Sequence, residues 1–188
     1  IYCWGANDVG QLGTGDGGVE RDFAMLVPSW DRVFSISSAG ASSCVSLLEG
    51  TNPRVRCWGG NGSGQLGDTT TSDNSTPTTV WGPLSAAVVR TGGSHSCAVM
   101  SAGTVKCWGQ NGSGQLGDLT TTERHTPVEV VVDAGCCGGA AMLDAVDVAL
   151  GSNFTCALAA DGGNLWCWGD NTNGQLGNGS VGSQTSRF

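Results

Sequence analysis

The chain has 188 residues, enough for one ordinary domain, and 39% of them are hydrophobic, which is compatible with a packed core. Eight Lys and Arg residues against 16 Asp and Glu give a formal net charge of −8, so the surface would repel nucleic-acid phosphates and no nucleic-acid partner is expected. The sequence has no run of about 18 apolar residues, so no membrane insertion is expected either.

Four copies of one short pattern follow one another along the chain. The triplet Cys-Trp-Gly begins at Cys3, Cys57, Cys107 and Cys167, and Gly-Gln-Leu-Gly begins seven residues after each of these cysteines. The repeats are spaced by 54, 50 and 60 residues, which is close to the period of a β-propeller blade. We therefore predict a single partial β-propeller domain over residues 1–188, with repeat boundaries near the four cysteines.

Short apolar runs indicate the strands of each repeat. In the repeat that contains Trp108 they lie at residues 87–90, 96–100 and 104–108, with a fourth after Thr126-Pro127 at residues 128–132 and its equivalent one repeat earlier at 78–80. Helix signals are weak because β-branched residues dominate these runs and glycines interrupt every helical window. Four strands per repeat predict an all-β fold of four-stranded antiparallel blades. The segments between them are polar loops at residues 68–76 and 118–126, and an insertion at 133–144.

A second cysteine precedes the Cys-Trp-Gly triplet in three of the repeats. Turn residues such as Ala102-Gly103 lie between the two cysteines, so each pair should face across a β-hairpin. Opposed residues in an antiparallel ladder have Cα atoms about 4.5 to 5.5 Å apart, within disulfide range. Zinc is the alternative, but it needs clustered ligands and these pairs are spread one per blade, so neither a metal nor a cofactor is expected. The predicted disulfides are Cys44–Cys57, Cys97–Cys107 and Cys156–Cys167, and they imply an oxidising, extracellular compartment.

Three cysteines fall outside these pairs. Cys3 has no upstream partner because the sequence begins inside the hairpin that should contain one, so the chain is expected to be part of something longer. The adjacent Cys136 and Cys137 lie in a Gly-rich loop, where a vicinal disulfide, bridges to other chains and free thiols all stay open.

Five Asn-x-Ser/Thr sequons are candidates for N-glycosylation, which would help to solubilise a chain with only 13% charged residues. The better candidates are Asn74 and Asn178. Asn153 lies near the start of a predicted strand. Asn61 and Asn111 occupy a position that recurs in every repeat, where Asn is expected first of all as a turn residue. Attached glycans are therefore expected, and the sequence leaves open which of the five sequons carry them.

A longer motif surrounds the Cys-Trp-Gly triplet. Residues 92–98 read Gly-Gly-Ser-His-Ser-Cys-Ala and residues 107–117 read Cys-Trp-Gly-Gln-Asn-Gly-Ser-Gly-Gln-Leu-Gly, and the next repeat has Phe154 in place of His95. This motif resembles the repeat of the regulator of chromosome condensation family, over nearly the whole chain. The resemblance implies a β-propeller, usually of seven blades. About three repeats cannot close such a ring, since seven at about 50 residues each would need roughly 350, so the other blades would lie outside this sequence or come from other chains.

No group of residues in the sequence predicts catalysis, and we expect no enzyme. The Gly-Gln-Leu-Gly segments are followed by neither a helix start nor a Lys, which favours turns over phosphate-binding loops. His95 occupies a repeat position and His125 lies in a Thr-rich loop, and neither is paired with a nucleophile. The repeat tryptophans are expected to pack between blades, with their N–H groups bonded to backbone: Trp4, Trp58, Trp108 and Trp168.

Disulfides, low charge and the lack of catalytic groups favour an extracellular structural or protein-interaction module of a surface or fibre-forming glycoprotein, bound to other proteins or to itself. The resemblance implies two alternatives. One is a guanine-nucleotide exchange factor for a small GTPase, the activity of the family's namesake. The other is a secreted enzyme inhibitor, for which the insertion at residues 133–144 could form the contact. A sugar-binding propeller face that bears Trp is a further alternative.

Overall fold

The structure is a computed structural model that describes residues 1–28, 30, 32–131, 144–160 and 163–182. The regular structure of these residues is entirely β-strand, which confirms the all-β prediction. None of the described residues belongs to a helix that could cross a membrane.

The described strands form four antiparallel sheets. The first pairs β1 (Tyr2–Gly5) with β2 (Arg21–Leu26). The second has the order β3 (Arg32–Ala39), β4 (Ser42–Glu49), β5 (Asn52–Gly59) and β6 (Asn74–Thr79). The third has the order β7 (Ala86–Thr91), β8 (His95–Met100), β9 (Val105–Gly109) and β10 (Arg124–Glu129). The fourth has the order β11 (Ala145–Leu150), β12 (Phe154–Ala159) and β13 (Leu165–Gly169).

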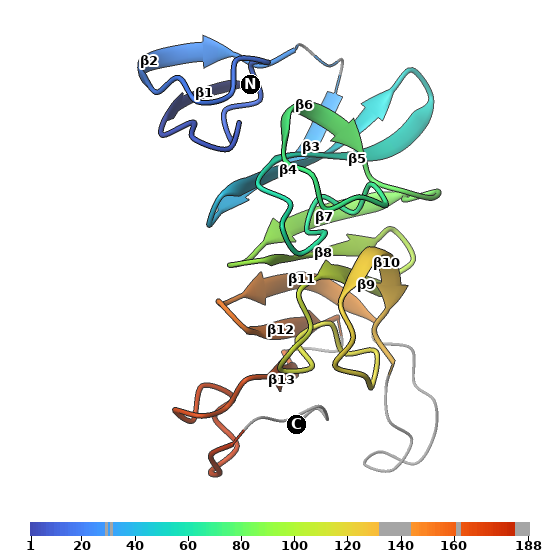
Figure 1. Ribbon diagram of the computed structural model, residues 1–188. Coiled ribbons are helices and arrows are strands. Elements are labelled where there is room, and N and C mark those ends of the chain that lie inside the picture. The colour runs from blue at the N-terminus through green and yellow to red at the C-terminus, as the bar shows by residue number, and fades with distance from the viewer. Residues whose placement is uncertain (29, 31, 132–143, 161–162, 183–188) are drawn as a thin grey trace.

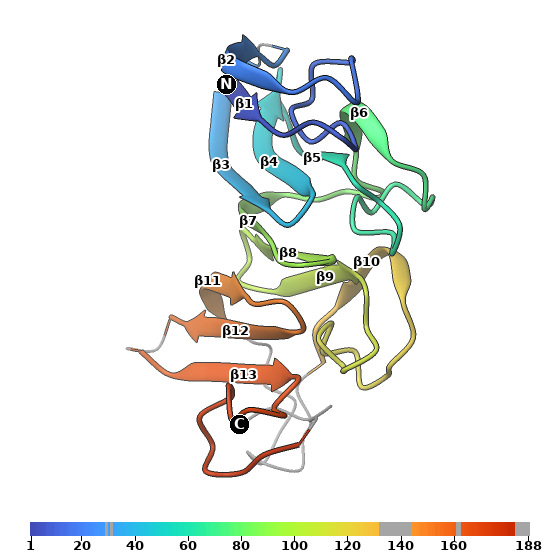
Figure 2. The same ribbon diagram turned by 60° about the vertical axis from the view of Figure 1, so that its left-hand side comes forward.

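The sheets follow one another in a row, each packed face to face on the next. Figure 1 shows β1 and β2 at one end of the row and β13 at the other, and Figure 2 shows the same row from another side. This is the arrangement of successive propeller blades.

In the three hairpins that contain a cysteine pair, the two cysteines lie directly opposite each other. The β4–β5 hairpin closes with Glu49 opposite Asn52, and Gly50 in the turn has a φ of 60°. Gly103 takes the left-handed conformation after β8, with a φ of 82°, and this places Cys97 directly opposite Cys107. A glycine adopts such positive φ values at no steric cost.

The outer strands of the second and third blades lie earlier in the sequence than expected. β6 and β10 begin at Asn74 and Arg124 and end at Thr79 and Glu129, so the expected strand at residues 128–132 is wrong beyond its second residue. Both strands include the Thr-Pro dipeptide that was expected to precede them. Pro is tolerated there because β6 and β10 are edge strands, whose outward N–H groups need no partner. The polar loops before these strands are correspondingly shorter.

Hydrophobic side chains between neighbouring sheets form the core. One cluster joins Val55 and Leu66 of one repeat to Val89 and Trp108 of the next. An equivalent cluster, which contains Trp168, joins the third sheet to the fourth. The core is therefore a series of interlayers between blades, and its largest side chains are the repeat tryptophans.

Candidate functional site

The turn that contains Gly-Gln-Leu-Gly is organised by the asparagine three residues before it. The Asn61 side-chain oxygen accepts a hydrogen bond from the Leu66 backbone N–H at 2.9 Å, while its Nδ2 donates to the carbonyls of Thr70 and Ser72 at 3.1 and 3.0 Å. The same bond to the leucine N–H, at 3.0 Å, is made by Asn7, Asn111 and Asn171. One buried amide thus holds both the turn and the loop that follows it, which is why Asn recurs there.

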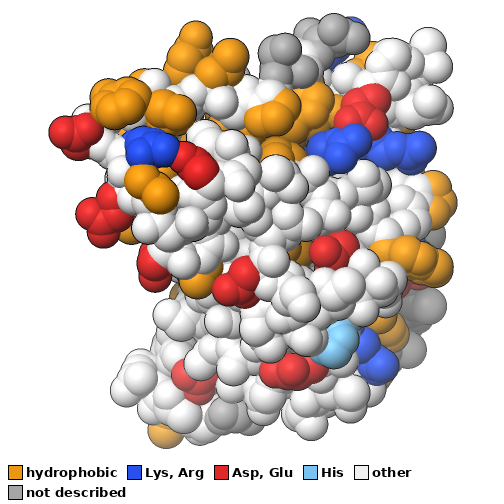
Figure 3. All heavy atoms as spheres, turned by 45° about the horizontal axis from the view of Figure 1, so that its top comes forward, with side chains coloured by type: hydrophobic (Ala, Val, Ile, Leu, Met, Phe, Trp, Pro, Cys, Tyr) orange, Lys and Arg blue, Asp and Glu red, His pale blue; other side chains and the backbone are white. Residues whose placement is uncertain are grey.

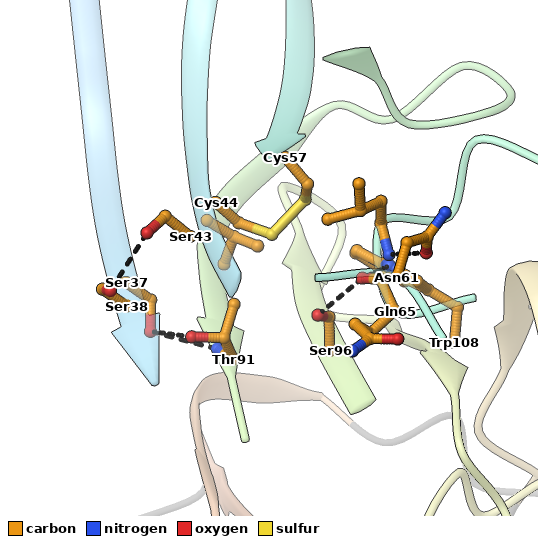
Figure 4. The surroundings of a disulfide bond; sticks show 12 residues. Ser37, Ser38, Ser43, Cys44, Cys57, Asn61, Gln65, Thr91, Ser96 and Trp108 are labelled. Atoms are coloured by element: carbon orange, nitrogen blue, oxygen red, sulfur yellow. Dashed lines mark hydrogen bonds between the residues drawn. A yellow bond between two sulfur atoms is a disulfide. The ribbon is translucent and has the colours of Figure 1, made fainter. Parts of the chain in front are cut away.

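The glutamine of this turn presents its backbone carbonyl to the next blade. Trp108 Nε1 donates to the carbonyl oxygen of Gln65 at 2.8 Å, and Ser96 Oγ donates to the same oxygen at 2.9 Å. Figure 4 shows these bonds beside the Cys44–Cys57 pair. A carbonyl oxygen has two lone pairs, so these two donors saturate it. We call this contact, between the Gly-Gln-Leu-Gly turn of one repeat and the Trp-Gly of the next, the blade joint.

Blade joints of the same geometry occur on both sides of this one. Trp58 and Ser43 donate to the Gln11 carbonyl at 2.9 and 3.2 Å. Trp168 and Thr155 donate to the Gln115 carbonyl, both at 2.9 Å. Sequence reasoning missed the hydroxyl donor, although its signal is plain: Ser43, Ser96 and Thr155 each precede the first cysteine of a pair by one residue.

The last glycine of each turn makes room for the indole of the next blade. A Cβ atom built on Gly67 would lie 2.8 Å from Nε1 and Cδ1 of Trp108, and one on Gly117 would lie 2.8 Å from Nε1 of Trp168. Both glycines also have positive φ, so no other residue fits without strain.

The expected packing role of the tryptophans is confirmed at three of the four repeat positions. Trp58, Trp108 and Trp168 are fully buried with their N–H groups bonded to backbone. Trp4 differs, since 65% of its surface is exposed. No described blade lies beyond β1 to cover it.

The structure places the sulfur atoms of the three cysteine pairs at disulfide distance. The Sγ–Sγ distances are 2.10 Å for Cys44–Cys57, 2.12 Å for Cys97–Cys107 and 2.04 Å for Cys156–Cys167, and every pair has a Cα–Cα distance of 4.1 Å. Each pair joins two neighbouring antiparallel strands: β4 and β5, β8 and β9, and β12 and β13.

Cys3 is a free, half-buried thiol at the equivalent position on β1. Burial raises the pKa of this thiol, against an opposing effect of the positive N-terminus. Cys136 and Cys137 lie outside the described residues, as does nearly all of the 133–144 insertion. In the described part of the chain, no three His, Cys, Asp or Glu side chains gather as metal ligands.

His95 is fully buried and supports the neighbouring joint. Its Nε2 lies 2.9 Å from Oγ1 of Thr155, and the only hydroxyl proton of Thr155 is donated to the Gln115 carbonyl. Nε2 must therefore carry the imidazole proton, which leaves Nδ1 as a buried acceptor with no hydrogen-bond partner among the described residues. Burial lowers the pKa of His95 to about 4, so the ring is neutral at physiological pH.

The carboxylates that follow the turns are occupied by local hydrogen bonds. Asp118 Oδ1 accepts from Nδ2 of Asn111 at 3.0 Å and from the Thr120 hydroxyl at 2.7 Å. Burial acts to raise the pKa of Asp118, but its hydrogen bonds with Thr120, Arg124 and Asn111 outweigh this and lower it. These bonds fix the loop geometry.

The sequons lie in different surroundings. Asn61 and Asn111 are fully buried and use Nδ2, the atom that would carry a glycan, to hold their own loops, so folding argues against both. Asn74, Asn153 and Asn178 are only partly buried. Asn74 and Asn178 use their side-chain oxygens as acceptors, and the structure gives their Nδ2 atoms no hydrogen bond within the described residues.

Most basic side chains are paired with acidic ones. Five of the chain's eight Lys and Arg residues form ion pairs: Arg21–Asp16, Arg56–Glu49, Arg90–Asp147, Lys106–Glu129 and Arg124–Asp118. Little unpaired positive charge is left on the described surface to attract a polyanion.

Comparison with known proteins identifies the repeat. Two models of the regulator of chromosome condensation (RCC1) repeat match, one at residues 54–99 and 102–158 and the other at residues 87–115 and 145–175. The chain is 30% identical over its whole length to the human probable E3 ubiquitin-protein ligase HERC4, of which it covers 17%. It is 36% identical over 109 residues to the mitochondrial RCC1 domain-containing protein RUG3 of Arabidopsis thaliana, which corresponds to 55% of this chain and 23% of that protein.

Among solved structures, Prp20p of Saccharomyces cerevisiae superposes with a TM-score of 0.73 at 24% identity, over 96% of this chain and 43% of Prp20p. Human WBSCR16 gives a TM-score of 0.62 at 16% identity, over all of this chain and 66% of that one. These structures establish the propeller fold of the chain, which spans only a minor part of the curated relatives. The chain belongs to the regulator of chromosome condensation (RCC1) repeat family.

Proposed function

We propose that the chain is an extracellular, disulfide-stabilised propeller module that acts through protein–protein contacts as part of a surface or fibre-forming glycoprotein. The observation that carries the proposal is the bonding distance between paired sulfurs in three successive blades. Disulfides persist in oxidising compartments and are rare in the cytosol. The similar protein RUG3 is mitochondrial, so this relative does not support an extracellular location. The proposed compartment is inferred from the cysteines of this chain.

The surroundings of the two histidines and the names of similar proteins support a binding role. The two histidines have structural surroundings: His95 supports a blade joint, and the carbonyl of His125 accepts the Thr69 N–H at 3.0 Å. Similar proteins also act on or bind proteins, since HERC4 is a probable ubiquitin-protein ligase and Prp20p has binding properties towards Gsp1p and histones.

Mass mapping of the native protein under reducing and non-reducing conditions tests the proposal. We expect three disulfide-linked peptide pairs that separate on reduction, in material recovered from outside the cell. A glycan, if attached, should add mass that glycosidase removes from peptides containing Asn74, Asn153 or Asn178. Free thiols at Cys44, Cys97 and Cys156 would overturn the extracellular assignment.

The alternative with a specific observation in its favour is nucleotide exchange on a small GTPase. Prp20p, which binds Gsp1p, superposes on 96% of this chain, although at 24% identity that likeness is one of fold. Release of labelled nucleotide from a panel of small GTPases separates the two proposals, and we expect no acceleration. Enzyme inhibition has no support within the described residues.

A further inference from the structure

Two of the four repeats have glycine directly after the asparagine that holds the turn. The dipeptides are Asn61-Gly62 and Asn111-Gly112, whereas the first and fourth repeats have Asp8 and Thr172 at the glycine position. A Cβ atom built on either of these two glycines would meet no described atom within 4 Å, and neither glycine has the positive φ that disfavours other residues. The fold therefore does not require glycine at this position, although it uses the asparagine before it.

Glycine makes the preceding asparagine chemically labile, because it has no side chain to hinder attack of its backbone nitrogen on the asparagine side chain. In that reaction the nitrogen of Gly62 bonds to Cγ of Asn61, and the Cγ–Nδ2 bond breaks. Nδ2 leaves as ammonia with the proton of the attacking N–H. Water then opens the cyclic imide, at Cγ to give aspartate or at the main-chain carbonyl to give isoaspartate. Water is the only co-reactant.

The folded chain holds the amide of Asn61 where this reaction is blocked. Asn61 is fully buried, and its Oδ1 accepts the Leu66 N–H at 2.9 Å. Its Nδ2 donates at 3.1 and 3.0 Å to the carbonyl oxygens of Thr70 and Ser72. It also donates to Oδ1 of Asp68 at 3.3 Å. Turning the side chain towards the next backbone nitrogen would break these bonds together, so the folded repeat protects the site.

An aspartate cannot replace either asparagine in these surroundings. Nδ2 of Asn111 likewise faces acceptors, namely the carbonyl oxygens of Thr120 and Thr122 and, at 3.0 Å, Oδ1 of Asp118. An ionised carboxylate has no hydrogen to donate, so one of its oxygens would lie buried against these acceptors and beside the carboxylate of Asp118 or, at the first site, of Asp68. Isoaspartate fits no better, since it adds a methylene group to the main chain of the turn.

We propose that Asn61 and Asn111 are deamidation sites that react only when their repeats open, and that the product prevents the opened repeat from folding again. Unfolding then becomes irreversible with time, because the unfolded state is modified before it refolds. Each reacted site also adds a negative charge to a chain of formal net charge −8, and Figure 3 shows acidic side chains already spread over the face that it draws. The inference goes beyond the proposed interaction role and does not depend on it.

Incubation of the full oxidised chain, with its free thiols alkylated, tests the protection. In concentrated guanidinium chloride and mildly alkaline buffer, both sites should deamidate at the rate of two further Asn–Gly pairs, Asn173-Gly174 and Asn178-Gly179. In the same buffer without denaturant, Asn61 and Asn111 should react at least about 100-fold more slowly, because local opening of buried segments is rare. Peptide mass mapping follows each site, and isoelectric focusing follows the more acidic product.

Refolding of samples taken during this incubation tests the consequence. After the denaturant is diluted, size-exclusion chromatography separates refolded from misfolded chain, and each pool is mapped. The refolded pool should keep asparagine at positions 61 and 111, whereas the reference pairs should be deamidated to the same extent in both pools. Gly62→Ala/Gly112→Ala is the matched variant, because it leaves both asparagines in place and hinders the attack. It should keep its refoldable fraction over the time in which wild type loses it.

A direct substitution tests the product itself. Asn61→Asp should increase the unfolded fraction at least about 100-fold, because it buries a charge without a partner. Asn74→Asp is the control with the same change of charge. Oδ1 of Asn74 accepts the N–H and the hydroxyl of Thr76, bonds that a carboxylate keeps, so this variant should fold like wild type.

Equal rates of deamidation at Asn61 and Asn111 in native and denatured chain would overturn the inference. Refolded chain with aspartate or isoaspartate at these positions would overturn it too, as would an alanine variant that loses refolding as fast as wild type. Any of these results with all three disulfides intact would leave the proposed extracellular module standing. Free thiols in the disulfide map would instead remove the proposed function and leave the deamidation result unaffected.

Discussion

Trp108 and Trp4 occupy the same position in their repeats and lie in opposite environments. Trp108 is fully buried, with its N–H on the Gln65 carbonyl, whereas Trp4 is 65% exposed. The residues around both are nearly identical in sequence, so the repeat motif alone does not determine burial. The neighbouring blade buries the tryptophan. The contrast between Trp108 and Trp4 therefore separates the stability that comes from contacts within a repeat from the stability that comes from contacts with the neighbouring repeat.

The largest expected difference is between tryptophan truncations at these two positions. Trp108→Ala should destabilise the fold by about 3–5 kcal/mol, because it empties a fully buried site and removes one of two donors to a buried carbonyl. Trp4→Ala should change stability by no more than about 0.5 kcal/mol, because the side chain is largely exposed. Urea unfolding of both variants measures the difference in the free energy of unfolding. Equal losses of stability would show that burial of the indole at the blade joint does not determine its contribution.

The next difference concerns the cysteines. The double variant Cys97→Ala/Cys107→Ala should lose roughly 3 kcal/mol, because the unfolded chain regains the freedom of a ten-residue loop. Cys3→Ala has no disulfide to lose and should cost about 0.5 kcal/mol or less. A reducing agent should lower the unfolding midpoint of the Cys3 variant as much as that of wild type. A double variant as stable as wild type would contradict a stabilising role.

The third difference lies between His95 and Phe154, which occupy the same repeat position. With a folded-state pKa of about 4 against an ordinary value of 6.5, His95 binds fewer protons in the folded chain than in the unfolded chain between these pH values. Its contribution is therefore fully present above pH 6.5 and declines as pH falls towards 4, by no more than about 3 kcal/mol.

His95→Phe, which copies the next repeat, should flatten the stability profile in this window. Denaturant unfolding at a series of pH values measures it. Asp118 provides an internal reference, because its lowered pKa makes its contribution disappear only below its ordinary value of 3.8. An unchanged slope in the His95 variant between pH 4 and 6.5 would assign the effect to other groups.

The sequence was sufficient to predict the disulfide register, and insufficient to predict the outer strands. Cys97 and Cys107 are opposed because a turn with a left-handed Gly103 allows one register, and the turn residues are visible in the sequence. β6 and β10 are polar edge strands that pair on one side only, so they carry no alternating pattern and tolerate Pro. Their limits are set by pairing with β5 and β9.

The sequence predicts the tryptophan donor of the blade joint but not its acceptor. A tryptophan recurring in every repeat indicated packing between blades, but its acceptor is a backbone carbonyl in the preceding repeat. A main-chain acceptor has no residue type to recognise, and its position depends on the spacing between sheets. The exposure of Trp4 was missed for the related reason that a single repeat does not reveal whether it has a neighbour.

The carbonyl acceptor of the joint has an evolutionary consequence. Because the oxygen that receives Trp108 and Ser96 belongs to the main chain, a duplicated blade inserted between two existing ones would create two matching contacts without any compensating substitution. Loss of a whole blade would likewise leave the two blades on either side of it with matching contact surfaces. Recombination can therefore lengthen or shorten such arrays one unit at a time, while side chains on the outer loops diverge freely.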